Sequence, residues 1–538
     1  MTMSTTRLHL VIAGLWLSLF LSAMDTTIIT TALIAVSSEF QALDQAAWLV
    51  TAYLLTYNSF LMITAKLSDV WGLKLTVLGF SAFFLIFSMA CSGAQTMTQL
   101  IIFRAFQGIG GSGLYSLVFV AIVKLVDPDK IALYSGVVSS VFALANLLGP
   151  LLGGIITDRT NWRWIFWMNG PVIVTAMALL IYAMPGLHDG KSSKERLRGF
   201  DVVGGILSVS WPIPLLFSLQ EAGVHYEWRG GIIIGTLVTG IVLFFLFGLY
   251  EAWVSYKTKL DALFPIKFLT SPTTAVTLLS MFLLGMPFYA MFIQLPQRFQ
   301  NVNFTSAERA GILLLPVTML TPVGAVVGGA IGKLITAEHT LLIATAMIGI
   351  GIGLLSSLPT TANFINATYA YEIITGFGLG LASPTYFIFL YTSIDEKDVS
   401  IGTGSLNMVR TLGGAVAVAI CTALHHGVLR ESLADFLSPE QISLVKESNA
   451  VVQSFSDESR KRLGQVMGRS YNRQFQVMLA FSLLNFVVAV VLVVIRKRAG
   501  TFGKTPVRTQ ENEFMKTVDA QGAERSNTPA QDGKEASR

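Results

Sequence analysis

Fourteen stretches of about 20 predominantly apolar residues follow one another along this chain of 538 residues. A helix of about 20 residues crosses the hydrocarbon layer of a bilayer, which is roughly 30 Å thick. Because 53% of the residues are hydrophobic and only 13% are charged, we predict an all-α polytopic membrane protein. The stretches lie at about 8–36, 46–65, 75–93, 97–123, 131–157, 164–185, 202–222, 231–252, 273–295, 309–332, 340–358, 367–392, 402–424 and 475–495.

An even number of spans places both chain termini on the same side of the membrane, and the basic residues indicate which side. Lys and Arg are enriched in the cytoplasmic loops of membrane proteins, so we expect both termini in the cytoplasm. Two acceptor sequons for N-glycosylation, at Asn303 and Asn366, fall in loops of the opposite face. The basic residues on the side of the amino terminus are Lys66, Lys74, Lys124, Lys130, Lys191, Lys194, Arg196, Arg198, Lys257, Lys259, Lys267, Arg496, Lys497 and Arg498.

Two polar segments stand apart from the spans. Residues 425–473 carry both signs of charge, and we predict a long outer loop with some helical periodicity at 442–455. Residues 499–538 contain almost no large apolar side chains, so we expect a disordered cytoplasmic tail.

Arg104 is the only charge within residues 96–123, so we expect it inside the membrane. A guanidinium there is costly unless it faces a cavity or a partner, which makes it a candidate functional residue. Asp25 lies within the first span at a similar depth, counted as helical rise. The two side chains could pair on neighbouring helices, and protonation of Asp25 would change that pairing. The alternatives are an arginine that snorkels to a headgroup and an aspartate that caps a helix break.

The loop KLSDVWGLK, residues 66–74, joins the second and third spans. Asp69 lies close to a tight turn at Gly72, which suits a carboxylate held against the N–H groups of a helix amino terminus. Such a contact would latch the two helices on the cytoplasmic side. A plain charged turn is the alternative.

The fifth span places a helix breaker among glycines. Pro150 follows Gly149 and precedes Gly153 and Gly154, so this helix could kink and pack closely against a neighbour. Directly outside it comes the sequence TNWRWIFWMNGP. Its tryptophans are typical of an interfacial aromatic belt. The residues of interest there are Trp162, Trp164, Trp167, Arg163, Asn169 and Pro171.

Taken together, these motifs resemble the major facilitator superfamily, and within it the drug:proton antiporters with fourteen spans, most like fungal members. The resemblance covers nearly the whole chain apart from the tail. Its sharpest pieces are the run Arg104-Ala-Phe-Gln107-Gly108, the Gly149-Pro150 motif and the run Trp162-Arg163-Trp164-Ile-Phe. Residues 411–414, after Arg410, resemble the penultimate-span pattern of the family.

The resemblance implies a role for each motif. It places Arg104 in proton coupling and Asp25 in the first-span signature, and it assigns the other residues to a gate, a hinge and a signature. Because Asp25 lies at a depth similar to that of Arg104, we assign the two together to proton coupling. At Ala65 and Ala145 this chain lacks expected glycines, and it has Val70 and Leu73 where basic residues are common, so the predicted gate has fewer charges. The implied cytoplasmic gate is Asp69, Gly72 and Lys74; the hinge is Gly149, Pro150, Gly153 and Gly154; the signature is Gln107, Gly108, Trp162, Arg163, Asn169, Pro171 and Arg410.

The implied architecture is the major facilitator fold, with two six-helix bundles plus two inserted central helices and a substrate site between the bundles near mid-membrane. Residues 1–185 would form the first bundle, and 186–272 the cytoplasmic linker and the two extra spans. Residues 273–498 would form the second bundle with its outer loop at 425–473, followed by the tail at 499–538.

The implied function is proton-driven efflux of toxic small organic molecules such as drugs, fungicides or secondary metabolites. Methionine and aromatic residues at 281–292 suit an amphipathic cargo, unless that stripe faces lipid. We expect no cofactor and no metal, because the proton gradient supplies the energy. The expected partners are the cargo, protons and the lipid bilayer, with no nucleic acid and a monomeric state. The expected location is the plasma membrane, with the vacuolar membrane as the alternative.

Three other functions stay open at this point. A transporter of a defined nutrient or of basic amino acids would share the fold. A membrane enzyme would need a catalytic set, and the chain has no HExxH motif, nucleophile elbow or phosphate-binding glycine loop; the pair His425-His426 is isolated. A non-transporting sensor would need a larger signalling segment than the roughly forty residues after Ala499.

Overall fold

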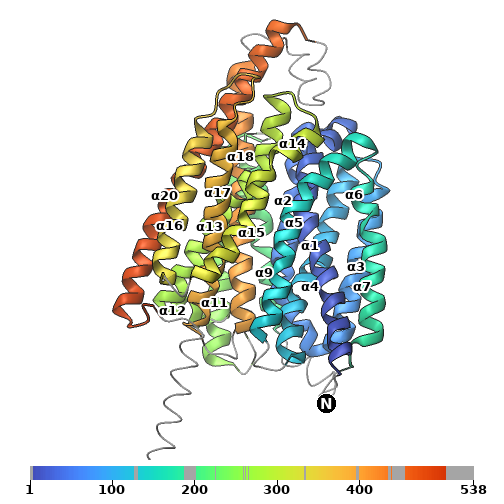
Figure 1. Ribbon diagram of the computed structural model, residues 1–538, viewed down its shortest axis with the longest axis vertical. Coiled ribbons are helices and arrows are strands. Elements are labelled where there is room, and N and C mark those ends of the chain that lie inside the picture. Colours follow the sequence, from blue (N-terminus) through green and yellow to red (C-terminus); the bar gives the residue numbers. More distant parts are fainter. Residues whose placement is uncertain are drawn as a thin grey trace, which may run out of the picture.

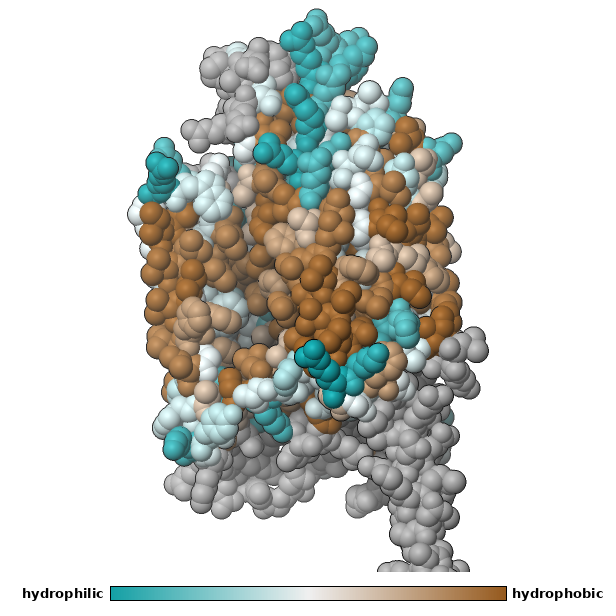
Figure 2. All heavy atoms as spheres, turned by 90° about the vertical axis from the view of Figure 1, so that its left-hand side faces the viewer, coloured by the Kyte–Doolittle hydropathy of each residue, from teal (hydrophilic) through white to brown (hydrophobic). Residues whose placement is uncertain are grey.

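The computed structural model is an upright bundle of long helices that run side by side (Figure 1). It describes residues 4–126, 131–186, 201–223, 226–258, 260, 262–264, 266–331, 335–394, 399–433, 438 and 455–503. A wide belt of apolar side chains covers the middle of the face seen in Figure 2, with hydrophilic residues above and below it. This is the surface that a bilayer requires, because apolar side chains contact lipid tails and polar ones contact water. The chain is therefore an integral membrane protein.

The first part of the chain forms the helices on the right of Figure 1. Within this group α1 packs against α5 and α7, and α4 packs against α2 and α3. Their bounds are α1 (Thr5–Glu39), η1 (Leu43–Gln45), α2 (Ala46–Trp71), α3 (Leu73–Ser92), α4 (Met97–Leu125), α5 (Ile131–Arg159), α6 (Trp164–Trp167) and α7 (Asn169–Ala183).

The last part of the chain forms a second group on the left of Figure 1. Here α13 packs against α18 and α20, α17 packs against α15 and α16, and α16 packs against α20. The bounds are α13 (Pro272–Asn301), α14 (Ala307–Leu313), α15 (Leu315–Ile331), α16 (Ala337–Ser356), α17 (Ala367–Tyr391), α18 (Val399–Leu433) and α20 (Asp457–Arg498).

Between these groups in the sequence come α9 (Val202–Ser210), α10 (Pro212–Glu221), α11 (Gly231–Lys257) and α12 (Lys267–Thr270). Pro212 begins α10, because proline has no N–H to continue α9 and is well suited to a first helical turn. α10 packs against α11 and α18, and α9 packs against α2 and α11. The inserted helices thus contact both groups.

Each of the fourteen apolar windows contains a helix or a pair of short consecutive helices. Twelve helices in the described part of the chain are long and apolar enough to cross a membrane, and α2 and α5 are outside that set. α2 has 26 residues and α5 has 29, and both pack inside the first group. The count of fourteen spans stays a prediction.

The segment predicted as one outer loop at 425–473 is helical at both ends. α18 continues to Leu433, and α20 begins at Asp457, so the predicted boundaries were wrong. The reason is a small second core beyond the membrane belt, in which apolar side chains of the two helix extensions pack together. It consists of Val302, Leu429, Leu433, Leu463, Val466, Met467 and Tyr471. Residues 442–454 of the predicted periodic stretch, and the tail from residue 504 onward, lie outside the described residues.

Candidate functional site

Arg104 lies in the interior of the first helix group, where only 1% of its surface is exposed. Its Nη1 donates to the Oδ2 atom of Asp25 on α1 and to Oε1 of Gln107 at 2.9 Å, and its Nε donates to the Leu49 carbonyl at 3.1 Å. The predicted pairing of Arg104 with Asp25 is confirmed. Both alternatives were wrong, because Arg104 does not reach a headgroup and α1 runs without a break through Asp25.

Polar side chains of three helices, α3, α4 and α7, extend this pair into a network. Gln107 on α4 donates to Asp25 Oδ1 at 3.1 Å and to the Ser88 hydroxyl of α3 at 3.3 Å. Asn169, at the start of α7, donates to the same hydroxyl at 2.8 Å. All of these side chains are at most 1% exposed. Two residues of the predicted signature, Gln107 and Asn169, therefore hold the candidate proton-coupling pair in place.

An aromatic face completes the surroundings of the guanidinium. The Tyr53 ring on α2 lies 4.3 Å from Arg104 Cζ, measured to the ring centroid, and the Phe166 ring lies at 5.8 Å. The Tyr53 hydroxyl donates to the Ser22 carbonyl at 3.4 Å. Cation–π contacts of this kind are stronger where water is excluded. The arginine is thus stabilised by one carboxylate, two other acceptors and a π surface.

Two of the three predicted hinge glycines, Gly149 and Gly153, lie where α5 contacts α1. A Cβ on Gly149 would lie 2.1 Å from Thr27 Oγ1, and one on Gly153 would lie 2.1 Å from the Ile28 carbonyl oxygen. The Thr31 hydroxyl donates to the Pro150 carbonyl at 3.2 Å. Gly108 is equally tight, since its Cβ would lie 2.3 Å from Thr56 Oγ1. These glycines therefore let the backbones of neighbouring helices approach closely around Asp25 and Arg104.

Sequence reasoning missed a contact between the two helix groups, at the end of the molecule opposite the amino terminus. Arg159 of α5 donates to both carboxylate oxygens of Glu308 on α14, at 2.7 and 3.1 Å. Beside it, a Cβ on Gly154 would lie 2.4 Å from the Ala307 carbonyl oxygen. The neighbouring Asp158 carboxylate accepts from the N–H of Ala307 at 3.2 Å. We call Asp158, Arg159, Ala307 and Glu308 the outer latch.

The predicted cytoplasmic gate is described only in part. Gly72 separates α2 from α3 with a φ of 85°, a conformation that glycine adopts without strain, so the predicted tight turn is confirmed. The Lys74 ammonium donates to the Ile181 carbonyl at 2.7 Å and ties this turn to the end of α7. The side chain of Asp69 lies outside the described residues, so its role stays a prediction.

The tryptophan motif binds the carboxyl-terminal end of α1. Trp162 Nε1 donates to one Glu39 oxygen at 2.6 Å, and Arg163 Nη1 binds the other at 2.7 Å. Trp164 and Trp167 are more than half exposed, as an interfacial belt requires. Pro171 lies in the first turn of α7 and is exposed.

In the second group, the stripe predicted at 281–292 faces protein. Met281, Phe288, Tyr289 and Phe292 of α13 are all buried, so the alternative that this stripe faces lipid was wrong for these residues. Arg410 of α18 lies with its Cζ 5.5 Å from the Phe288 ring centroid, and its Nε has no hydrogen-bond partner in the part of the chain that the structure describes. This arginine offers a free donor beside a buried aromatic surface.

A further carboxyl group that the sequence did not single out is Glu372 of α17, which is fully buried and has no hydrogen-bond partner for either oxygen among the described residues. Its signal in the sequence was one carboxylate inside an apolar window, the same signal that identified Asp25.

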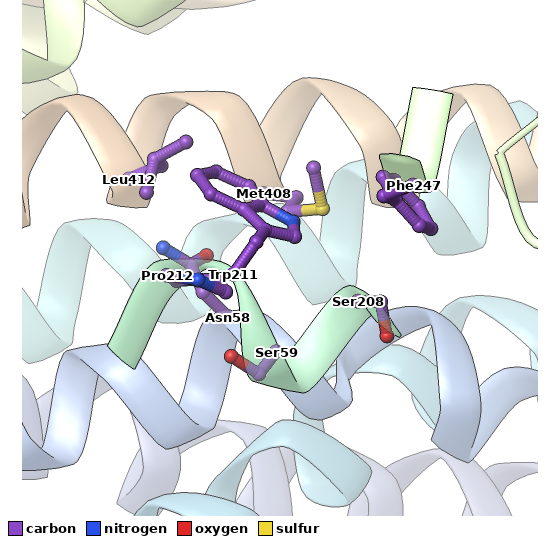
Figure 3. A pocket seen from close by; sticks show the side chains of 8 residues that line it. All are labelled: Asn58, Ser59, Ser208, Trp211, Pro212, Phe247, Met408 and Leu412. Atoms are coloured by element: carbon purple, nitrogen blue, oxygen red, sulfur yellow. The ribbon is translucent and has the colours of Figure 1, made fainter. Parts of the chain in front are cut away.

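A small pocket lies where the inserted helices meet both groups (Figure 3). It encloses about 290 Å³, counting the space open at its mouth. Hydroxyl and amide groups line one part and apolar side chains the other. The lining residues are Asn58 and Ser59 of α2, Ser208, Trp211 and Pro212 at the α9–α10 junction, Phe247 of α11, and Met408 and Leu412 of α18.

The two sequons lie at the same end of the molecule as the outer latch. Asn303 follows α13, and its amide nitrogen donates to the Ala362 carbonyl at 3.1 Å in the loop that carries Asn366. Asn366 is exposed at the start of α17. Glycosylation at either position stays a prediction. Among the described residues, no group of three or more His, Cys, Asp or Glu side chains is arranged to hold a metal ion.

Comparison with known proteins gives concordant results. A family model described as Major Facilitator Superfamily matches residues 15–418. The chain is 38% identical over 499 residues to the MFS-type transporter FPY5 of Fusarium mangiferae, covering 90% of this chain and 84% of that protein. It is 30% identical to the Aspyridones efflux protein of Neocamarosporium betae, covering 81% and 77%. A bacterial homologue of the human lysosomal transporter Spinster, in an inward-facing conformation, superposes with a TM-score of 0.62 at 14% identity, covering 91% and 98%.

Proposed function

The chain belongs to the Major Facilitator Superfamily, and from this premise we propose that it is a proton-coupled antiporter that exports toxic small organic molecules. Its family and its relatives are transporters, several of them named efflux pumps. The observation that carries the proton coupling is the buried contact between Asp25 and Arg104.

The chemistry follows from the burial of that pair. Removing two charges from water costs several kcal/mol for each ion, and their attraction offsets this only while both are charged and hydrogen-bonded. A proton on Asp25 removes the negative charge, so Arg104 then keeps only neutral acceptors and the Tyr53 ring. Protonation would therefore change the relative stability of two arrangements of α1 and α4. This is what coupling a proton to a conformational change requires.

The outer latch and the close contact of α5 with α14 indicate that the structure is closed at the end away from the amino terminus. In the proposed cycle, opening of the latch exposes the pair to the side from which protons enter. Closing it returns the protein to the arrangement seen here. The proposed orientation, with both termini in the cytoplasm, makes the latch an extracellular or lumenal contact.

The cargo class is proposed from the buried surface between the helix groups. Phe288, Tyr289 and Phe292 of α13 form contiguous aromatic contacts, and Tyr57 of α2 packs against Tyr115 of α4 with ring centroids 6.0 Å apart. Tyrosine and methionine side chains adapt to cargoes that have an apolar body and a few polar groups. We propose that such amphipathic compounds bind here, that no cofactor takes part, and that the protein acts as a monomer in the plasma membrane.

The test combines a toxin panel with a transport assay. A pump-deficient cell that produces the protein should resist at least one amphipathic toxin, and everted vesicles should accumulate that toxin when their interior is acidified. A protonophore should abolish the accumulation. Accumulation that persists with the protonophore, or substrate-dependent proton flux elicited only by nutrients or basic amino acids, would contradict the proposal.

A further inference from the structure

Two buried carboxyl groups of the inserted helices each have one oxygen without a hydrogen-bond partner among the residues that the structure describes. Asp201 caps α9 and is 3% exposed. Its Oδ1 accepts from the Gly204 N–H at 2.8 Å and from the Tyr250 hydroxyl at 2.8 Å. Its Oδ2 is buried and has no hydrogen-bond partner within the described part of the chain. Helix capping therefore accounts for the contacts of Oδ1 but gives no reason for the burial of Oδ2.

Glu251 on α11 repeats the pattern. It is fully buried, and its Oε2 accepts from the Phe264 N–H at 3.1 Å, which fixes the loop after α11. No described residue provides a hydrogen-bond partner for its Oε1. A buried polar atom without a partner costs about 1–3 kcal/mol, and more if it carries charge, so two such atoms at one place need an explanation.

Gly204 shows that the two unpaired oxygens converge. A Cβ built on this glycine would lie 2.3 Å from Asp201 Oδ2 and 2.7 Å from Glu251 Oε1. Both oxygens therefore approach the same point on the surface of α9. Any residue larger than glycine at position 204 would push the two carboxyl groups away.

The described residues near the pair provide one basic side chain, which is one fewer than two carboxylates need. Tyr250, on the same helix as Glu251, contacts Asp201 through its hydroxyl, and Lys66 of α2 attracts Glu251 electrostatically. Among the described residues these are the titratable groups that act on the pair from the packed helices. Lys66 offsets one negative charge. A second buried negative charge beside the first would be repelled and poorly solvated. Two carboxyl groups that share one proton avoid both costs.

We propose that Asp201 and Glu251 form a proton-binding site in which one proton is shared between Asp201 Oδ2 and Glu251 Oε1 and joins α9 to α11. This site lies in the inserted helices and is separate from Asp25 and Arg104. It lies at the end of the molecule that carries the amino terminus, because Gly205 packs near Ile63 of α2, close to Lys66. The site does not depend on the identity of the cargo.

The shared proton makes the stability of the folded protein depend on pH. Carboxyl groups of the unfolded chain lose their protons at about pH 4, whereas in this proposal the folded protein still holds one proton at the pair at neutral pH. A rise in pH therefore favours unfolding. Loss of the proton leaves two carboxylates that repel one another, and the contact between α9 and α11 weakens. The wild-type unfolding temperature should therefore fall as the pH rises through the range in which this proton is lost.

The experiment uses the full-length protein in lipid nanodiscs. Infrared spectra at neutral pH report protonated carboxyl groups through their C=O stretch, and thermal unfolding is followed across the pH range. The variants are Glu251→Gln, Asp201→Asn and the double variant; Glu458→Gln, an exposed glutamate on α20, is the matched control. Each single variant should lose the same carboxyl signal, and the double variant should lose no more than either one. Glu251→Gln should also remove the alkaline fall in unfolding temperature, since its amide donates without a titratable proton.

Three results would overturn the proposal. The first is a carboxyl signal unchanged in Glu251→Gln, which would mean that Glu251 does not share a proton. The second is a double variant that loses twice the signal of a single one, which would mean two separately protonated groups. The third is a wild-type unfolding temperature at high pH that is restored by sodium or potassium ions, which would assign a cation instead of a proton. If Asp201→Asn fails to fold because the helix cap is lost, Glu251→Gln alone still decides whether this carboxyl group is protonated.

Discussion

Arg104 is tolerated in the interior of a membrane protein because its Nε and Nη1 atoms donate to three acceptors and the Tyr53 ring lies against its guanidinium. The sequence predicted this residue and its partner because each is a single charge within an apolar window. It could not predict the roles of Ser88 and Tyr53 in the same site. Those residue types are common in membrane helices, and only the packing of α2 and α3 against α4 brings them together.

The first prediction concerns the energetics of the pair. Arg104→Gln leaves the Asp25 carboxylate buried without its cation and should destabilise the protein by about 3–5 kcal/mol. Adding Asp25→Asn removes the stranded charge, so the double variant should unfold at a higher temperature than Arg104→Gln alone. Thermal unfolding of the purified proteins measures this. Strictly additive effects of the two substitutions would show that the pair contributes no mutual stabilisation.

At the scale of elements, close helix contacts depend on single glycines. Gly153→Ala puts a methyl group 2.1 Å from the Ile28 carbonyl oxygen, so α5 must move away from α1 at a cost of about 1–3 kcal/mol. Gly79→Ala on α3 is the control, because no atom lies within 4 Å of its Cβ position. We expect a lower unfolding temperature and slower transport for Gly153→Ala only. Equal behaviour of the two variants would contradict the hinge assignment.

The outer latch allows a test of movement between the helix groups. Cysteines in place of Arg159 and Glu308, joined by a short bifunctional thiol reagent, should stop transport until the link is cleaved, because α5 and α14 can then not separate. The control pair replaces Glu39 and Arg163, which are ion-paired within the first group, and its cross-link should leave transport largely intact. The native Cys91 and Cys421 are buried. Full transport with the Arg159–Glu308 positions linked would show that the latch does not open.

Helix positions were predictable from the sequence to a useful degree, since each apolar window contains a helix. The ends of α18 and α20 were not predictable, because their polar surface resembles a loop. Only the packing of Leu429 and Leu433 of α18 with apolar side chains of α20 reveals the second core. The ion pair of Arg496 with Glu338 was also missed. In the sequence Arg496 is one of three basic residues after the last span. In the structure its side chain is fully buried and binds the Glu338 carboxylate at 2.8 Å.

For the whole molecule, the charge distribution predicts one orientation in the membrane. The run 496–498 and the amino terminus should face the cytoplasm, and the loop that carries Asn366 should face the opposite side. Single cysteines in place of Lys497 and Asn366, probed in intact cells with a thiol reagent that does not cross membranes, should react only at position 366. Reaction at position 497, with or without reaction at 366, would contradict this topology.

The most direct test of proton coupling uses the purified protein in liposomes with an exported toxin from the panel. A cargo gradient in wild-type liposomes should drive protons in the opposite direction, as recorded by a pH-sensitive dye. Asp25→Asn should bind the same cargo and exchange it across the membrane while moving no protons, and Asp457→Asn, which changes an exposed aspartate, should behave as wild type. Cargo-driven proton movement by Asp25→Asn at the wild-type rate would contradict the assignment of the coupling site.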